Sequence, residues 1–241
     1  FVGGSFAKDT MIKKDNYDID LFLRFNEDGD LSDLTHDLLE GICDFEMMHG
    51  SRDYFKVKIK DFIYFELVPV KKVNNPKDAE NITDLSYSHV KYINKKIKDK
   101  KILDEIRLAK AFCYATRCYG AESYISGFSG YSLELLVYYY GSFLKFLNGM
   151  IKASKKKNKI IIDIEKQHKH GKNISLDLNS AKLISPIVLI DPTYKHRNAL
   201  AALSEETFKR FIAEAEKFLK SPTEEAFEPR KTDIEAIKAK A

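Results

Sequence analysis

Hydrophobic and polar positions follow two different periods along the chain, and together these periods predict an α+β protein. Residues 17–25, 51–60 and 61–70 alternate with period two and predict strands. The last of these segments, DFIYFELVPV, is the most apolar and is expected at the centre of a mixed sheet. Residues 31–49 instead place leucines and other apolar residues at helical spacing.

The second half of the chain has a different pattern. Apolar spacing predicts helices near 83–97, 102–118 and 131–148, and the runs KIIIDIE and ISPIVLID predict strands. SEETFKRFIAEAEKFLK predicts a last amphipathic helix with Ser204 as its cap, and the tail from Ser221 is expected to be weakly ordered.

The linker VNNPKDAEN separates the two patterns and predicts a domain boundary. We therefore expect a first domain over residues 1–75, a helical central domain over 80–150 and a partial third domain over 151–241. The third domain is expected to carry a basic segment.

Composition narrows the class of protein. The chain has 241 residues, of which 44% are hydrophobic and 32% charged, so we expect a soluble globular protein with an ample core. No apolar stretch approaches the length of a membrane span, so no membrane partner is expected. The first residue is Phe, which indicates a missing upstream segment whose targeting signal cannot be seen. Three cysteines without CxxC spacing favour a reducing, cytoplasmic setting.

The net charge is only +4, but the lysines are unevenly distributed. Six of them lie between Lys91 and Lys101, and a second basic stretch runs from Lys152 to Lys172. The ordinary interpretation of each run is solvated surface. Two such runs beside an acidic site would favour phosphate binding, provided that the site handles nucleic acid.

The candidate chemistry begins with two carboxylates in an apolar strand. Asp18 and Asp20 project to one face, roughly 7 Å apart, and this arrangement is costly unless a positive charge joins them. Gly3-Gly4-Ser5 precedes them and forms a turn whose backbone amides and hydroxyl can approach a phosphate. A third acid, Glu66, is expected on an adjacent strand.

Three acids beside such a turn predict a site for two divalent cations, and oxygen ligands favour Mg²⁺, with Mn²⁺ as the alternative. Two other interpretations stay open: Asp18 and Asp20 as an edge-strand charge pair, and Glu66 as the partner of a lysine on the neighbouring strand. Asp163 and Glu165 repeat the same spacing. They lack a glycine turn and have lysines around them, so we expect them to be structural.

The order GGS…DID resembles the DNA polymerase β-like nucleotidyltransferase superfamily. Two longer motifs, YGAESYISGFSGYSLELLVYYYGSF and DPTYKHRNALAALS, resemble the archaeal, class I CCA-adding tRNA nucleotidyltransferases. The resemblance runs from Phe1 to about Leu219 and implies an α+β fold: a nucleotidyltransferase head with a mixed sheet, a helical central domain and the start of a third α/β domain. It implies template-independent addition of C, C and A to the tRNA 3′ end from CTP and ATP, by two-metal transfer that releases pyrophosphate.

The resemblance also implies roles for individual residues. Asp18, Asp20 and Glu66 match the catalytic metal carboxylates. The positions expected to bind the nucleotide are Gly4, Ser5 and Lys8 at the triphosphate, His89, Lys110 at phosphate, Tyr119 at ribose and Arg197 at the base. The alternatives are a surface residue for His89 and for Arg197, a solvated helix lysine for Lys110 and a core residue for Tyr119.

The chain departs from the family pattern in three places. Glu66 stands where the third carboxylate is usually Asp, and Ser126 stands where the family often has Arg. The chain also ends soon after Arg230, whereas family members continue into a domain that grips the tRNA, so the sequence is either truncated or a streamlined enzyme.

Two other functions stay open. One is another template-free nucleotidyltransferase, such as a poly(A) polymerase or an oligonucleotide second-messenger synthase. The other is a catalytically weakened RNA-binding relative. The residues leave the oligomeric state undecided, a homodimer included.

Overall fold

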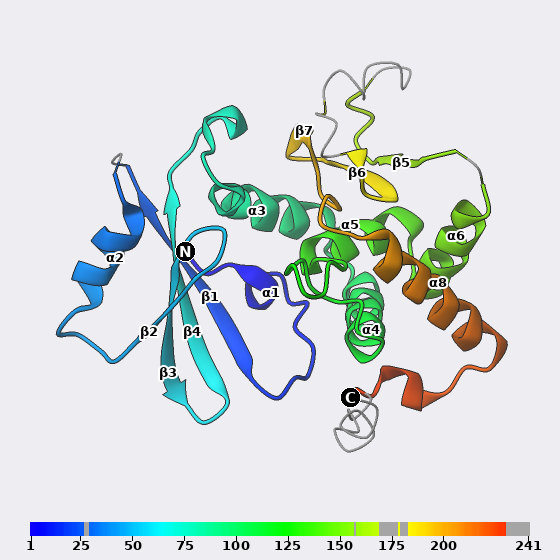
Figure 1. The fold of residues 1–241 in the computed structure, drawn as a ribbon, viewed down its shortest axis with the longest axis horizontal. Coiled ribbons are helices and arrows are strands. Elements are labelled where there is room, and N and C mark those ends of the chain that lie inside the picture. Colours follow the sequence, from blue (N-terminus) through cyan, green and yellow to red (C-terminus); the bar gives the residue numbers. More distant parts are fainter. Residues whose placement is uncertain (27–28, 157, 169–177, 179–182, 230–241) are drawn as a thin grey trace, which may run out of the picture.

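The computed structural model of the protein describes residues 1–26, 29–156, 158–168, 178 and 183–229. A four-stranded sheet forms one side of the molecule, and helices with a smaller three-stranded sheet form the other (Figure 1). This arrangement confirms the predicted α+β class. Within the described residues, no helix combines the length and the apolar character needed to cross a membrane.

The larger sheet is mixed, and the predicted central strand lies inside it. Its strands are β1 (Tyr17–Phe25), β2 (Glu46–Met48), β3 (Tyr54–Lys60) and β4 (Ile63–Lys71), in the order β1-β4-β3-β2. β1 runs parallel to β4, and the other pairs are antiparallel. The most apolar predicted strand is β4, which pairs on both sides, as expected.

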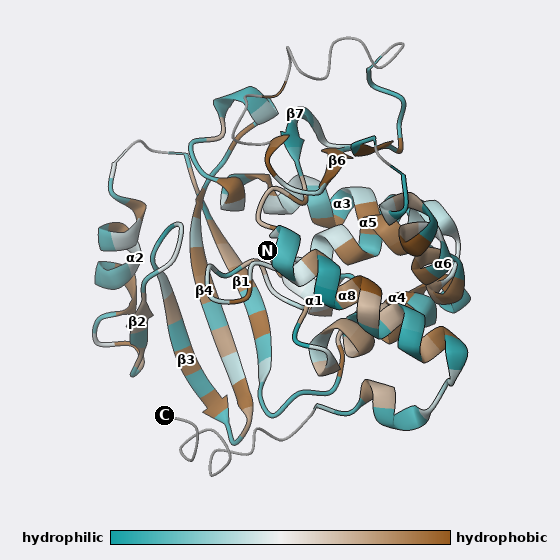
Figure 2. Ribbon diagram, turned by 45° about the vertical axis from the view of Figure 1, so that its right-hand side comes forward, coloured by the Kyte–Doolittle hydropathy of each residue, from teal (hydrophilic) through white to brown (hydrophobic). Residues whose placement is uncertain are grey.

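The two faces of this sheet differ in chemistry, and the alternation is visible along β3 and β4 in Figure 2. Helix α2 (Leu31–Leu39) covers the face that carries Phe55, with His36 against its ring. The predicted helix over 31–49 is too long, because Gly41 takes a left-handed conformation (φ 76°) just after α2 ends. The opposite face carries the predicted acids and looks toward helix α1 (Gly4–Ala7).

The helical part begins after the linker. Its elements are η1 (Pro76–Asp78), η2 (Ile82–Leu85), α3 (Ser86–Lys96), α4 (Lys100–Ala115), α5 (Gly130–Tyr140) and α6 (Phe143–Ser154). The single helix predicted over 131–148 is in fact two. Gly141 ends α5 in a left-handed conformation (φ 85°), and the Ser142 side chain then caps α6 by accepting from the Lys145 N–H.

The last described part adds β5 (Ile160–Asp163), β6 (Ile187–Asp191), β7 (Tyr194–Asn198), α8 (Glu205–Lys220) and η4 (Glu224–Phe227). These strands form the smaller sheet in the order β5-β6-β7. Strand β7 was not predicted, because its residues YKHRN lack an apolar pattern. The Ser204 side chain accepts from the Thr207 N–H at the start of α8, which confirms the predicted cap.

One hydrophobic core joins helices α3–α6 to the smaller sheet and α8, with Phe112, Phe146 and Phe211 almost fully buried in it. The expected domain boundary at 150/151 therefore does not coincide with a break in this core. The tail expected to be weakly ordered also packs on it up to Phe227, whose ring lies 5.5 Å from that of Phe218. The rest of that expectation, over 230–241, lies outside the described residues.

A buried ion pair joins the linker to the sheet. Asp84 in η2 accepts from the Arg52 guanidinium at 2.6 Å, and its two oxygens also accept the backbone N–H groups of Lys71, Glu80 and Asn81. The Asp84 side chain has no exposed surface. Its carboxylate therefore fixes the direction in which the chain leaves β4 for the helices.

Asp84→Ala is expected to lower the free energy of unfolding by about 3 kcal/mol, because one buried cation and three N–H groups lose their acceptor. Asp78→Ala, at an exposed position in the same linker, is the matched control and should change it by less than about 0.5 kcal/mol. Urea unfolding measures both. Equal effects of the two variants would contradict the role of Asp84.

Candidate active site

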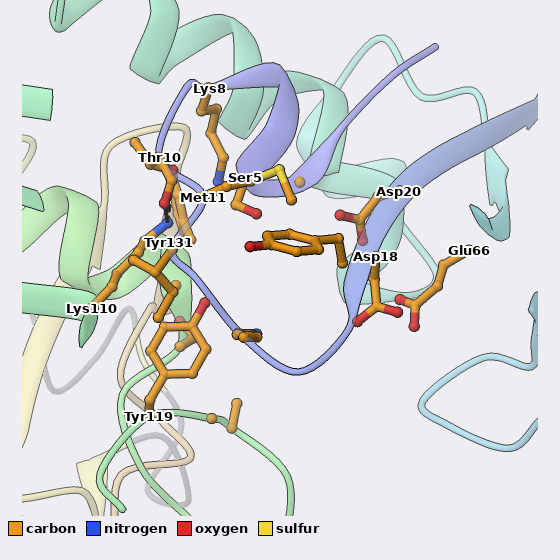
Figure 3. Close-up of a pocket in the computed structure, with 18 of the residues that line it drawn as sticks. Ser5, Lys8, Thr10, Met11, Asp18, Asp20, Glu66, Lys110, Tyr119 and Tyr131 are labelled. Carbon is orange, nitrogen blue, oxygen red and sulfur yellow. Dashed lines mark hydrogen bonds between the residues drawn. The ribbon is translucent and has the colours of Figure 1, made fainter. Parts of the chain in front are cut away.

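A cavity of about 420 Å³ lies between the acidic face of the large sheet and the helices. Its lining comes from α1 and the loop after it, from β1, β3 and β4, from α4, and from the turn that leads into α5. Figure 3 shows the acids on one side of this cavity and Lys8, Lys110 and Tyr119 on the other. Eight of the residues predicted from sequence line it: Gly4, Ser5, Lys8, Asp18, Asp20, Glu66, Lys110 and Tyr119.

The three acids meet because of strand register. Asp20 on β1 lies directly opposite Glu66 on β4, and Asp18 projects to the same face two residues earlier. The turn before them fits closely around Asp20. A Cβ added to Gly4 would lie 1.6 Å from an Asp20 carboxylate oxygen, and Gly4 has a left-handed conformation (φ 59°). Only glycine fits at this position.

Electrostatic repulsion is strong among these acids. Burial, followed by the charges of Asp18 and Asp20, raises the pKa of Glu66 to about 7. Burial also raises the pKa of Asp20. Carboxylate oxygens are the ligands that hard divalent cations prefer, and such a cation would relieve this repulsion. The oxygen ligands of Asp18, Asp20 and Glu66 therefore suit a divalent metal in their chemistry, although they do not all lie within 4.8 Å of one another.

A lysine from the neighbouring strand also reaches these acids. The Lys56 Nζ lies 2.7 Å from Asp18 Oδ1 and 3.5 Å from Glu66 Oε1. The open alternative, in which Glu66 pairs with a lysine on the adjacent strand, is therefore realised in this structure. Because Lys56 also binds Asp18, the three residues Asp18, Lys56 and Glu66 form one charge cluster.

The opposite side of the cavity is built on a carboxylate that the sequence analysis missed. Glu134 on α5 has no exposed surface and accepts from Lys8 Nζ at 2.7 Å, Lys110 Nζ at 2.7 Å and Thr10 Oγ1 at 2.7 Å. Lys110 also donates to the carbonyl and hydroxyl oxygens of Thr10. Each of its three N–H groups thus has an acceptor, while Lys8 has Glu134 as its one acceptor among the described residues.

This cluster is charged at neutral pH. Burial opposes ionisation of Glu134, but Lys110 and Lys8 outweigh it and hold the pKa of that carboxyl at about 2. Burial lowers the pKa of Lys110 to about 8 against the attraction of Glu134. Lys110 is only 1% exposed, so its alternative interpretation as a solvated helix lysine is wrong. A signal was present in the sequence: Glu134 interrupts the apolar run LELLVYYY, and a buried acid must be paired.

Tyr119 lies half-buried at the cavity wall and packs against the main core. Its ring lies 5.0 Å from Lys14 Nζ, and its hydroxyl oxygen would be 2.9 Å from a Cβ at Gly130. Gly130 opens α5 and therefore leaves room for this hydroxyl at the cavity. Tyr119 serves both as core and as lining.

His89 and Arg197 do not line this cavity. Both bind Asp191, a buried acid at the end of β6 that the sequence analysis missed: His89 Nε2 lies 3.0 Å and Arg197 Nη1 2.5 Å from its Oδ2. His89 stacks on Tyr131, which does line the cavity and also donates to Asp191. His89 is buried, and Arg197 pairs at 16% side-chain exposure, so neither is an ordinary surface residue.

Arg197 instead lines an adjoining cavity of about 400 Å³, which shares Ala121 and Ser129 with the first one. Burial lowers the pKa of His89, so its imidazole is neutral at neutral pH. Burial opposes ionisation of Asp191, but the hydrogen bond from His89 and the charge of Arg197 hold the pKa of that carboxyl well below its usual range.

The second acid pair behaves as expected of a structural one. Glu165 binds Lys96 at 2.7 Å and accepts from Tyr92, while Asp163 accepts the N–H of His168. Lys96 belongs to the first basic run, so one of its lysines is engaged in this pair. Of the second basic run, residues 157 and 169–172 lie outside the described residues.

The family model for the second domain of tRNA nucleotidyltransferase matches residues 104–228, about half of the chain. The chain belongs to the tRNA nucleotidyltransferase family. It is 35% identical over 241 residues to the CCA-adding enzyme of Nanoarchaeum equitans and 34% identical over 235 residues to that of Thermococcus kodakarensis. These alignments cover 98% and 94% of the chain. The resemblance to archaeal CCA-adding enzymes is thereby confirmed.

The chain spans 59% of the length of the first of these relatives and 50% of the second. Among solved structures, it is similar to the Cid1 poly(U) polymerase, with a TM-score of 0.67 at 12% identity over 95% of this chain and 85% of that one. At this identity the likeness bears on fold alone, and it confirms the predicted nucleotidyltransferase fold. The parallel pair β1–β4 carries the three acids.

The raised pKa of Glu66 predicts a pH-dependent loss of stability in the metal-free protein. Between pH 4.5 and about 7 the folded state binds more protons at Glu66 than the unfolded state, so stability falls as pH rises through this window. Glu66→Gln should therefore stabilise the protein in EDTA by up to about 3 kcal/mol at pH 8 and have little effect at pH 4.5. Urea unfolding at the two pH values measures this. A gain of equal size at both would contradict it.

Glu134→Gln should lower the free energy of unfolding by about 3 kcal/mol, because it leaves two buried ammonium groups without a countercharge. Adding Lys110→Met should recover part of this loss, since it removes one of the two stranded charges. Glu122→Gln, an exposed acid that lines the same cavity, is the control and should leave stability unchanged. A Glu134→Gln protein as stable as wild type would refute this account of the cluster.

Proposed function

We propose that the chain catalyses template-independent addition of C, C and A to the 3′ end of tRNA, with CTP and ATP as substrates and pyrophosphate as the product. The observation that carries the proposal is the arrangement of charge across one cavity. Three carboxylates face a buried lysine cluster, in a chain of the tRNA nucleotidyltransferase family. A nucleoside triphosphate with its metal ions has the matching charges.

The residues at the acidic side would hold the metal. Asp18, Asp20 and Glu66 supply oxygen ligands suited to Mg²⁺, or to Mn²⁺. When bound, the metal lowers the pKa of the attacking RNA 3′-hydroxyl and neutralises charge on the leaving pyrophosphate. The protein's part is to fix the backbone of these residues on two paired strands, so that their carboxylates share one face beside the cavity.

The residues at the opposite side would bind the triphosphate. The Ser5 hydroxyl can donate to a phosphate, and so can the N–H groups of Lys8 that do not bind Glu134; Lys14 also lines the cavity. Lys110 already donates to three acceptors, so its main contribution is to hold the cluster in place and to add positive charge to it. It can donate to a phosphate only if it gives up one of these three hydrogen bonds. Tyr119 lies at the wall, where it can support the ribose.

Base selection would come from the adjoining cavity. Asp191 holds Arg197 by one guanidinium nitrogen, and among the described residues the other donors of this planar group remain for acceptors on a base edge. Neutral His89 fixes Asp191 and packs on Tyr131 between the two cavities. Without a nucleic-acid template, such fixed donors are what can distinguish C and A from G and U.

The exposed lysines of the first basic run, such as Lys91, and of the second, such as Lys152, would bind the tRNA backbone in a salt-dependent way. The free cysteines fit a reducing cytoplasm as the place of reaction.

The test is incorporation of labelled CTP and ATP, supplied separately and together, onto a tRNA that lacks its terminal CCA. The proposal predicts two C additions followed by one A. The double variant Asp18→Asn, Asp20→Asn should lower the rate by about a thousandfold or more, because the transferring phosphoryl group loses its electrostatic stabilisation. Glu165→Gln, from the acid pair of equal spacing, is the control and should keep the wild-type rate.

Other outcomes identify other functions. A long homopolymer tail would indicate a poly(A) polymerase-like enzyme, and short oligonucleotides made without RNA would indicate a second-messenger synthase. Binding of tRNA without nucleotide incorporation at any Mg²⁺ or Mn²⁺ concentration would refute the proposed activity for this chain.

A further inference from the structure

The acidic side of the cavity contains a cation of its own. The ammonium of Lys56 forms a 2.7 Å ion pair with Asp18 and lies 3.5 Å from Glu66. Lys56 on β3 pairs directly with Glu66 on β4, which in turn pairs with Asp20 on β1, so three charged residues stand in one row across the sheet. Its side chain is only 22% exposed, which limits screening of this charge by water.

This position conflicts with a metal ion. An Asp18 oxygen that accepts an ammonium proton at 2.7 Å has one lone pair fewer for a divalent cation. Any cation held between Asp18 and Glu66 would also be repelled by the adjacent ammonium. The Lys56 side chain has another contact nearby, because its Nζ already lies 4.5 Å from the centre of the Tyr64 ring. Its flexible stem can therefore leave Asp18 while the cation–π contact is kept.

We propose that Lys56 is an internal counter-ion that competes with the divalent metal for Asp18 and Glu66, and so sets the metal affinity of the free protein. The proposal rests on the metal-binding role proposed for these acids. It assigns a function to the lysine beyond neutralising charge. The free protein binds metal weakly, and a metal ion that occupies the site displaces the ammonium from Asp18.

The test measures Mn²⁺ binding directly, by electron paramagnetic resonance of free Mn²⁺, on the whole chain without nucleotide. Lys56→Met keeps the length and apolar stem of the side chain and removes its charge. It should lower the Kd for Mn²⁺ by about threefold to tenfold, the size expected for loss of one partly exposed competing charge. Lys56→Arg retains the charge and should bind Mn²⁺ as the wild type does.

The matched control is Lys58→Met. Lys58 lies two residues along the same strand, on the same face, but pairs with Asp61 at 3.1 Å. Its substitution removes the same net charge and should change the Kd by less than twofold. A similar tightening in both variants would show a general charge effect and overturn the proposal.

The double variant Asp18→Asn, Asp20→Asn distinguishes the proposed competition by Lys56 from the proposed metal-binding role of the acids. If this variant loses Mn²⁺ binding but Lys56→Met binds no more tightly than wild type, the metal site stands and the competition by Lys56 is refuted. If the double variant binds Mn²⁺ as well as wild type does, the ion lies elsewhere, and both the metal role of the acids and the inference about Lys56 fail. Tighter binding in Lys56→Met alone, lost on adding the Asp18 and Asp20 substitutions, supports the proposal.

Discussion

The carboxylate of Glu134 is fully buried and holds residues from three separate elements at one point. Lys8 comes from the end of α1, Thr10 from the loop after it, and Lys110 from α4, while Glu134 itself lies on α5. An ionised group in such a place is tolerable only when its countercharges are fixed beside it. The cluster thereby ties the first residues of the chain, which pair with β1, to the helical part, and the cavity is the space between them.

This arrangement also places negative and positive charges on opposite sides of the cavity. The acids of β1 and β4 lie on one side of the cavity and the lysines bound to Glu134 on the other, as Figure 3 shows. The acids lie on two paired strands, and Lys110 and Glu134 lie on helices that pack in the main core. The two charged groups therefore stay on opposite sides of the cavity in the absence of substrate.

A second buried carboxylate, that of Asp191, holds distant residues together in the same way. This acid ends the apolar strand β6, is buried as Glu134 is, and holds two functional candidates, His89 and Arg197, that are far apart in sequence. Tyr131 lies between this group and the main cavity. Both buried acids act through the residues they orient. Glu134 lies inside the first long family motif and Asp191 begins the second, but the sequence analysis assigned neither acid a role.

Local pattern was enough to predict several features. Alternation located β1, β3 and β4, the apolar content of β4 placed it inside the sheet, and Ser204 marked the start of α8. The pattern failed where a single residue changed the backbone, as at Gly41 and Gly141, because helical spacing of side chains continues past a glycine that ends the helix. It also failed for β7, whose polar residues pair with β6 by backbone hydrogen bonds.

By itself, the sequence determined which residue types stand at which spacing: the acids two apart on a strand, the glycine turn before them, and the two long family motifs. Only the tertiary structure decided which distant charges pair. Lys56 meets Asp18 through strand register, and Glu134 meets Lys8 across 126 residues. Pairing of buried charges depends on distances set by packing, and no local spacing contains that information.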